Sequence, residues 1–254
     1  MDIFIALLFS LGINGAMFLV AFKRKTDHLT DISYAATFVA LTGYAAVVGQ
    51  INSVYQWILA FMVILWAVRI GSYLLMRIRK MGRDKRFDDK RDSFIKFGGF
   101  WLLQAITVWV VLLGVTKFMF TRESNVNTML VVIGFGIWLV GLAVEAIADL
   151  QKFNFINDKN NKGRWIDVGL WKYSRHPNYF GEILVWAGVF VFVSSVLVGS
   201  DLLIALISPV FIAILLIFVS GIPLLEKSAD KRWGKDKKYL EYRRRTSVLV
   251  IAPR

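Results

Sequence analysis

The sequence contains no cysteine, which excludes whole classes of structure and chemistry. A disulfide scaffold, a thiolate nucleophile, an iron–sulfur cluster and a cysteine-based zinc site all require thiols. Histidine is scarce as well, with two residues in the chain, so we expect no metal site. There is no Walker-type phosphate loop and no strand-based GxGxxG. The glycines of GFGIW at 134–138 lie in an apolar stretch and indicate helix packing.

Charge is also scarce, and acidic charge most of all. Charged residues make up 19% of the 254 residues, whereas about 25% is usual. The 18 Asp and Glu stand against 31 Lys and Arg, which gives a net charge of +13. A basic nucleic-acid binder or a disordered basic tail would not be 57% hydrophobic with 20 Phe and 9 Trp. The composition predicts a polytopic protein of the lipid bilayer with no nucleic-acid partner.

Seven stretches are long and apolar enough to cross a bilayer, which takes about 20 mostly apolar residues. They lie at 2–22, 32–51, 54–76, 97–120, 127–148, 179–199 and 202–225. Six spans is the main alternative, and the third stretch is then the one to remove from the count. The predicted fold is therefore all-α, a polytopic membrane protein with about seven transmembrane helices.

The positive charges predict the orientation of these spans. With seven spans, the segments 23–31, 77–96, 149–178 and 226–254 share one face, and they carry 28 of the 31 Lys and Arg. The positive-inside rule then places the C-terminus in the cytoplasm and the N-terminus outside, in agreement with Asp2 before the first span. Loops on the opposite face are too short to build a site, so we expect the active site on the cytoplasmic side, most simply of a bacterial inner membrane.

Two of the basic segments have distinct patterns. The segment 77–96 mixes both signs of charge and is expected to be a solvated connection. The tail from Glu226 to Arg245 interleaves charges with Trp233, Tyr239 and Tyr242, which predicts a C-terminal interfacial helix lying on an anionic leaflet.

A few charges lie where hydropathy alone would not place them. Glu145, Asp149 and Lys152 share one face of the fifth span as it ends, and an acid at that depth needs a partner or water. Asp149 and Lys152 could also simply satisfy each other at the interface. Arg69 lies within the third span, and we expect it to pair with Glu145 or Glu182, or to hold an anion.

The segment Tyr173–Glu182 is the densest cluster of polar groups. Pro177 suits the first turn of a helix, so the sixth span is predicted to begin there. The positive end of that helix beside Arg175 and His176 would form an anion site, for which phosphate is the natural ligand. Taken singly, Arg175 could bind lipid head groups and His176 could cap the helix. Together with the embedded Glu182 they favour a functional site.

The motif D-x-G-L-W-K-Y-S-R-H-P-N-Y-F-G-E-x-x-x-W-x-G from Asp167 to Gly188, preceded by E-x-x-x-D-x-Q-K from Glu145, resembles the bacterial DUF1295 family. That family is similar to the steroid 5α-reductases. The third-span WAVRIGSYLLMR and the tail motif that begins at Glu226 carry the same resemblance, which covers most of the chain from about Arg69 onward. Isoprenylcysteine carboxyl methyltransferases share the R-H-P-x-Y-x-G element.

The resemblance implies a single membrane-embedded domain over 1–254, with the spans of 2–76 on the substrate side and 97–254 on the NADPH side. It implies reduction of a carbon–carbon double bond conjugated to a carbonyl in a lipophilic substrate, with steroid-like, isoprenoid-like or fatty-acyl-like chemistry. The implied cofactor-binding residues are Arg69, Asp149, Lys152, Tyr173, Ser174, Arg175, His176, Asn178, Tyr179, Arg232 and Tyr239. The implied catalytic residues are Glu145, Tyr179 and Glu182.

The sequence departs from the animal steroid reductases at the substrate end. Their Gln-Glu pair is replaced by Gln50-Ile51, and Trp66 stands where they have a Tyr three residues before the third-span Arg. A steroid substrate is therefore not implied, and Tyr34, Tyr44 or Tyr179 could supply the proton. Two other functions remain open: an S-adenosylmethionine-dependent carboxyl methyltransferase of the isoprenylcysteine type, and a non-catalytic lipid-binding protein.

Overall fold

The computed structural model describes residues 3–82, 84, 87–122 and 125–252, which fall into two compact units. Unit 1 is Met1–Val131 with Phe192–Ser208, and unit 2 is Val132–Val191 with Pro209–Arg254. Asp2, which supports the predicted orientation, lies outside the described residues.

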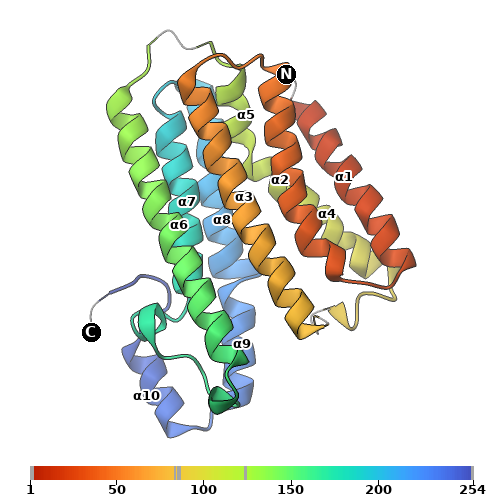
Figure 1. Cartoon of the computed structure of the whole chain (residues 1–254), viewed down its shortest axis with the longest axis vertical. Helices are drawn as coiled ribbons and strands as arrows, with labels where there is room; N and C mark the ends of the chain where they lie inside the picture. Colours follow the sequence, from red (N-terminus) through yellow and green to blue (C-terminus); the bar gives the residue numbers. More distant parts are fainter. Residues whose placement is uncertain (1–2, 83, 85–86, 123–124, 253–254) are drawn as a thin grey trace. The chain divides into compact units, whose positions relative to one another are not determined.

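Regular structure in the described residues is helical, as predicted (Figure 1). The helices are α1 (Ile3–Lys23), α2 (His28–Val48), α3 (Val54–Met81), α4 (Phe94–Val111), α5 (Leu113–Phe120), α6 (Thr128–Asn157), α7 (Pro177–Val193), α8 (Gly199–Ile214), α9 (Ile222–Trp233) and α10 (Lys237–Arg245). Short helical turns η2 (Lys159–Asn161) and η3 (Gly169–Lys172) precede α7, and a π-helical segment η4 (Leu215–Val219) follows α8. No strand occurs in these ranges, although Ser174 and Ser247 form an isolated parallel β-bridge.

The multi-span membrane fold is confirmed, since six described segments are long and apolar enough to cross a bilayer. They are α1, α2, α3, α4, α6 and the run Gly199–Trp233, which joins α8, η4 and α9. The remaining predicted span, the sixth at 179–199, corresponds to α7, whose 17 residues are fewer than the other six have. A count of six spans would therefore omit the sixth predicted span. It would not omit the third, because α3 is a continuous helix of 28 residues.

The fourth predicted span, 97–120, is broken into α4 and α5 at Leu112. Beside the break, the Ser208 hydroxyl donates a hydrogen bond of 2.7 Å to the backbone oxygen of Val111. A side chain that donates a hydrogen bond to a helix carbonyl in this way disturbs the regular ladder of backbone hydrogen bonds, which accounts for the break.

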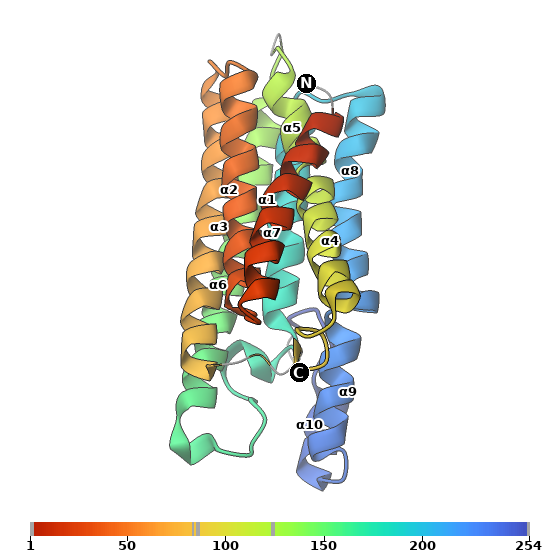
Figure 2. The same cartoon turned by 90° about the vertical axis from the view of Figure 1, so that its right-hand side faces the viewer.

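In unit 1, α2 packs against both α1 and α3, and α1 packs against α4 (Figure 1, Figure 2). A buried polar network joins three of these helices. The Gln104 amide of α4 donates to Asn14 Oδ1 of α1 at 2.8 Å and to Ser33 Oγ of α2 at 2.9 Å, and Asn14 Nδ2 donates to Thr37 Oγ1 at 3.2 Å. Hydrogen bonds of this kind join helices where no water is available.

The prediction of a solvated connection over 77–96 is wrong in part. Arg77 belongs to α3 and lies 3.4 Å from Asp31 of α2. Arg91 is buried, with its Nε 3.6 Å from Asp27 Oδ1, and Asp27 Oδ2 accepts a 2.7 Å hydrogen bond from the Asp84 backbone. A buried charge needs a counter-charge, and alternating signs in the sequence do not reveal which residues fold inward.

The predicted interfacial helix over Glu226–Arg245 is two helices, α9 and α10. Gly234 ends α9, and Asp236 caps α10 by accepting a 2.8 Å hydrogen bond from the Lys238 backbone. An aspartate at such a position starts a new helix because its carboxylate satisfies otherwise free N–H groups. The break turns the tail into two short helices that can face different neighbours.

Candidate functional site

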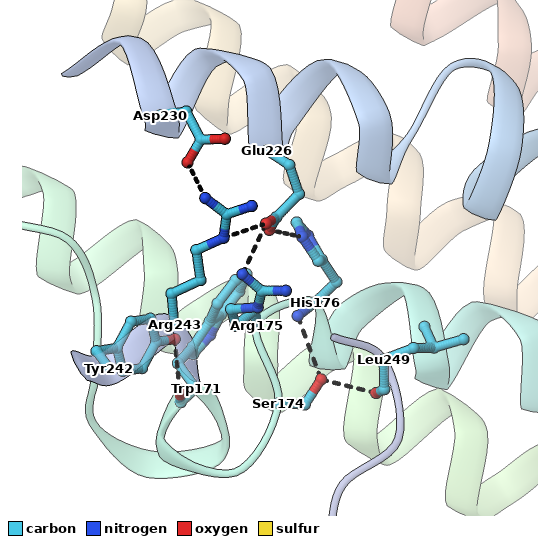
Figure 3. Close-up of polar contacts among 9 residues, drawn as sticks. All are labelled: Trp171, Ser174, Arg175, His176, Glu226, Asp230, Tyr242, Arg243 and Leu249. Atoms are coloured by element: carbon cyan, nitrogen blue, oxygen red, sulfur yellow. Dashed lines mark hydrogen bonds and ion pairs between the residues drawn. The ribbon is translucent and has the colours of Figure 1, made fainter. Parts of the chain in front are cut away.

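The site is built in unit 2 around the first residues of α7. The helix begins at Pro177, as predicted, because proline has no N–H to lose in a first helical turn. Before it, the Arg175 backbone donates a 2.8 Å hydrogen bond to the Ser247 carbonyl, and Ser174 Oγ donates to the Leu249 carbonyl at 2.7 Å. Figure 3 shows the Ser174–Leu249 contact. The end of the tail therefore fixes the segment that carries Arg175 and His176.

The carboxylate of Glu226 on α9 lies close to three basic side chains (Figure 3). Glu226 Oε2 lies 2.7 Å from Arg175 Nη1, and Glu226 Oε1 lies 2.8 Å from His176 Nε2. Arg243 of α10 approaches the same carboxylate at 3.9 Å and pairs with Asp230 at 2.6 Å. The side chain of Arg175 is 10% exposed and that of Glu226 is 18% exposed, so water screens this pair little.

His176 is held as a neutral hydrogen-bond donor. Burial lowers the pKa of His176, and although the hydrogen bond and charge of Glu226 act in the opposite direction, burial prevails. Since a carboxylate only accepts, His176 Nε2 carries the proton in this pair. The ring also stacks on Tyr179, with centroids 5.7 Å apart and planes within 10°. His176 Nδ1 makes no hydrogen bond to any described residue, so the ring does not cap α7.

Two acids of α6 lie buried in the same unit. Glu145 is 2% exposed and Asp149 is 4% exposed, so both side chains are shielded from bulk water. Asp149 Oδ1 accepts a hydrogen bond of 3.3 Å from Asn178 Nδ2 of α7. Glu182 lies one helical turn beyond Asn178 and is half-buried. These contacts place an acid and an amide beside the Arg175–His176 pair.

The two helices that carry these acids approach closely at glycines. A Cβ at Gly181 would lie 2.6 Å from the Glu145 backbone nitrogen, and a Cβ at Gly141 would lie 2.6 Å from that of Val185. A Cβ at Gly188 would collide with the backbone of Trp138. Small residues at these positions let α6 and α7 touch backbone to backbone. Glu145 is thus set directly against the start of α7.

Lys152 lies against the loop that connects α6 to α7. Its ammonium group lies 4.7 Å from the centroid of the Trp171 ring, and the indole of Trp171 donates a 3.0 Å hydrogen bond to the Ala148 carbonyl. The Gln151 side chain accepts from the Leu170 backbone at 2.9 Å. Tyr173 is half-buried, with the Lys172 ammonium 5.7 Å from its ring.

The tail packs against this loop through four aromatic side chains: Trp165, Trp233, Tyr239 and Tyr242. Trp165 meets Tyr239 edge to face at 5.3 Å, and Trp233 meets Tyr239 at 5.8 Å. Trp233 Nε1 donates to the Gly163 carbonyl at 2.7 Å, and the Tyr242 hydroxyl donates to the Trp171 carbonyl at 2.8 Å, as Figure 3 shows for the latter. Burial raises the pKa of Tyr239, which keeps its hydroxyl protonated.

The structure therefore brings most of the expected residues into one unit but gives them different surroundings. Asp149, Arg175, His176, Asn178 and Tyr179 cluster at the start of α7. Ser174 and Tyr239 are buried in contacts between the loop and the tail, and Arg232 is exposed. Arg69 is half-buried in α3 of unit 1, so its predicted pairing with Glu145 or Glu182 of unit 2 stays a prediction.

Sequence reasoning missed Glu226 and Arg243 as members of the site. Glu226 is the first charged residue after the last apolar stretch, and this position was the available signal. Neither residue differs in type from the many charges that follow in the tail. Their role depends on the turn at Gly234, which brings α10 back toward α9 so that Arg243 reaches Asp230.

Comparison with known protein families gives a match over most of the chain. The model of a family described as "Protein of unknown function (DUF1295)" matches residues 17–246, which is nearly the whole chain. No curated protein and no solved structure matches the chain.

Proposed function

The chain belongs to the DUF1295 family, and we propose that it is a membrane-embedded reductase that uses NADPH to saturate a double bond conjugated to a carbonyl. The proposed substrate is lipophilic, of a steroid-like, isoprenoid-like or fatty-acyl-like kind. The proposal includes a bacterial inner membrane with the site on the cytoplasmic side. The observation that carries it is the cluster of Arg175, His176 and Asn178 with the buried Glu145 and Asp149.

The polar side chains at the start of α7 fit the phosphate, hydroxyl and amide groups of a nucleotide. Arg175 beside the positive end of α7 would hold phosphate, for which a guanidinium is well shaped. Arg175 Nε and Asn178 Oδ1 are buried and have no hydrogen-bond partner in the described part of the chain. Buried polar atoms in proteins are nearly always paired, so these two favour a polar ligand. Asp149 and Asn178 could meet its hydroxyl or amide groups.

Bound NADPH would supply a hydride to the β-carbon of the conjugated substrate. The chain's own task would be to exclude water, orient the carbonyl and deliver a proton, which low-dielectric surroundings favour. Tyr179 is the proposed proton donor of this unit, since its ring is fixed against His176. The other tyrosine candidates belong to unit 1, where Tyr44 stacks on Phe9 and Tyr34 meets Trp66 edge to face.

A thermal-shift titration of the detergent-purified protein tests the proposal. Saturating NADPH should raise the unfolding temperature, because a ligand at about 100 times its Kd stabilises by about 2.7 kcal/mol. The Arg175→Gln variant should lose most of this shift. The matched variant Arg164→Gln, which changes an exposed arginine of the same loop, should keep it.

The same titration separates the alternatives. A shift with S-adenosylmethionine and none with NADPH would support the methyltransferase and contradict the reductase. A protein that neither nucleotide stabilises, in which Arg175→Gln and Glu182→Gln alter lipid binding alone, would be the non-catalytic lipid binder.

A further inference from the structure

We infer that Glu226 is a positioning residue of this site, whose carboxylate sets the hydrogen-bonding direction of the His176 ring and holds the Arg175 guanidinium in place. The inference rests on the proposed function, because these are the groups proposed to meet the ligand. Glu226 lies on α9, fifty residues after His176 in the chain, and outside the motif that first pointed to the site.

The His176 ring has one hydrogen-bonding anchor among the described residues. Nε2 donates to Glu226 at 2.8 Å, whereas Nδ1 is buried with no partner there. The charged groups that act on the ring are Glu226 of α9, Lys152 of α6 and the adjacent Arg175, and Tyr179 of α7 stacks on its face. The carboxylate therefore decides which nitrogen carries the proton. It leaves the opposite nitrogen as a bare acceptor.

The same carboxylate fixes Arg175 with its other oxygen. Because Oε1 binds His176 and Oε2 binds Arg175, the Glu226 side chain cannot rotate without breaking both contacts. Arg243, which is itself paired with Asp230, supports the carboxylate from α10. An arginine already held in its binding rotamer loses less freedom when it meets a phosphate, which raises affinity.

The hydrogen-bonding direction can be measured without any ligand. The chain has two histidines, so selective ¹⁵N-histidine labelling gives two ring systems, and the variant His28→Gln assigns them. His176 should show a protonated Nε2 and a bare Nδ1 at neutral pH. A protonated Nδ1 with a bare Nε2 in the wild-type protein would overturn the inference.

The variant Glu226→Gln keeps the size of the side chain and removes its charge. The pKa of His176 should fall further, because the carboxylate stabilises the imidazolium by hydrogen bond and charge. The affinity for NADPH should fall by on the order of tenfold, a loss like that seen when a group that orients a metal ligand is removed. The matched control is Glu241→Gln on α10, whose carboxylate pairs with the exposed Arg245, and it should change neither quantity.

The outcomes separate this inference from the function on which it rests. If the wild type binds NADPH and a folded Glu226→Gln binds it equally well, the positioning role is wrong while the reductase stands. If the wild type binds no NADPH, the reductase falls, and the ring measurements alone decide whether Glu226 positions His176. A cooperative thermal unfolding transition, together with unchanged signals of His28 in unit 1, shows that a variant is folded.

Discussion

Single buried charges in this chain depend on partners that are distant in the sequence. Asp27, between α1 and α2, is 5% exposed and faces Arg91 from the segment before α4. Replacing Arg91 by Met would leave a buried carboxylate without its counter-charge, which costs about 3 kcal/mol or more. We expect a clear fall in the unfolding temperature. The control Lys90→Met breaks the largely exposed pair with Asp89 and should cost less than about 1 kcal/mol.

The buried imidazole of His176 predicts a pH dependence of stability. Because burial lowers its pKa below the ordinary 6.5, the unfolded chain binds a proton at a higher pH than the folded chain does. The stability contributed by the neutral ring is therefore complete above pH 6.5 and is lost as the pH falls below it. The unfolding temperature of the wild type should drop more steeply below that pH than that of His176→Gln. Equal slopes for the two proteins would contradict this expectation.

For single residues, the sequence indicates which residue types belong to the site, but it does not indicate their partners. Arg175, His176 and Asn178 form a compact motif next to a proline, and their clustering follows from the start of one helix. Glu226 could not be separated from its neighbours because only the folded chain brings its carboxylate to the motif. A tertiary ion pair has no local pattern, unlike a helix cap.

Among the helices, the packing of α6 on α7 gives the sharpest prediction. The variant Gly181→Ala would press a methyl group into the backbone at Glu145, and overpacking of this kind costs about 1–3 kcal/mol. We expect lower thermal stability and, if the proposed function holds, weaker NADPH binding. The matched control is Gly136→Ala on α6, where a Cβ meets nothing within 4 Å. It should be neutral or slightly stabilising, since Ala favours helices over Gly by about 1 kcal/mol.

Element boundaries were predictable where local chemistry sets them. Pro177 fixed the expected start of α7, and the apolar runs marked the other long helices. The break at Leu112 was not predictable, because the disturbance comes from Ser208 on another helix. The division of the tail at Gly234 and Asp236 had a local signal, a glycine and a capping aspartate two residues apart.

For the whole molecule, α7 decides the topology. Its 17 residues extend about 26 Å at 1.5 Å per residue, close to the 30 Å of a bilayer core. If α7 crosses, the number of spans is odd and the two ends of the chain lie on opposite faces. We expect this arrangement with the C-terminus in the cytoplasm, as the basic segments predict. Compartment-sensitive reporters fused to either end test it, and two ends on one side would contradict a seven-span topology.

The pairing of Arg175 with Glu226, a residue of the later helix α9, also bears on how the protein is made. The ribosome delivers the start of α7 to the insertion machinery before α8 and α9 have been synthesised. During that interval the guanidinium has no carboxylate from α9 to receive it. Water or a lipid phosphate must stabilise the nascent hairpin of α6 and α7 until Glu226 emerges. The ion pair between Arg175 and Glu226 therefore forms only after α9 has been synthesised.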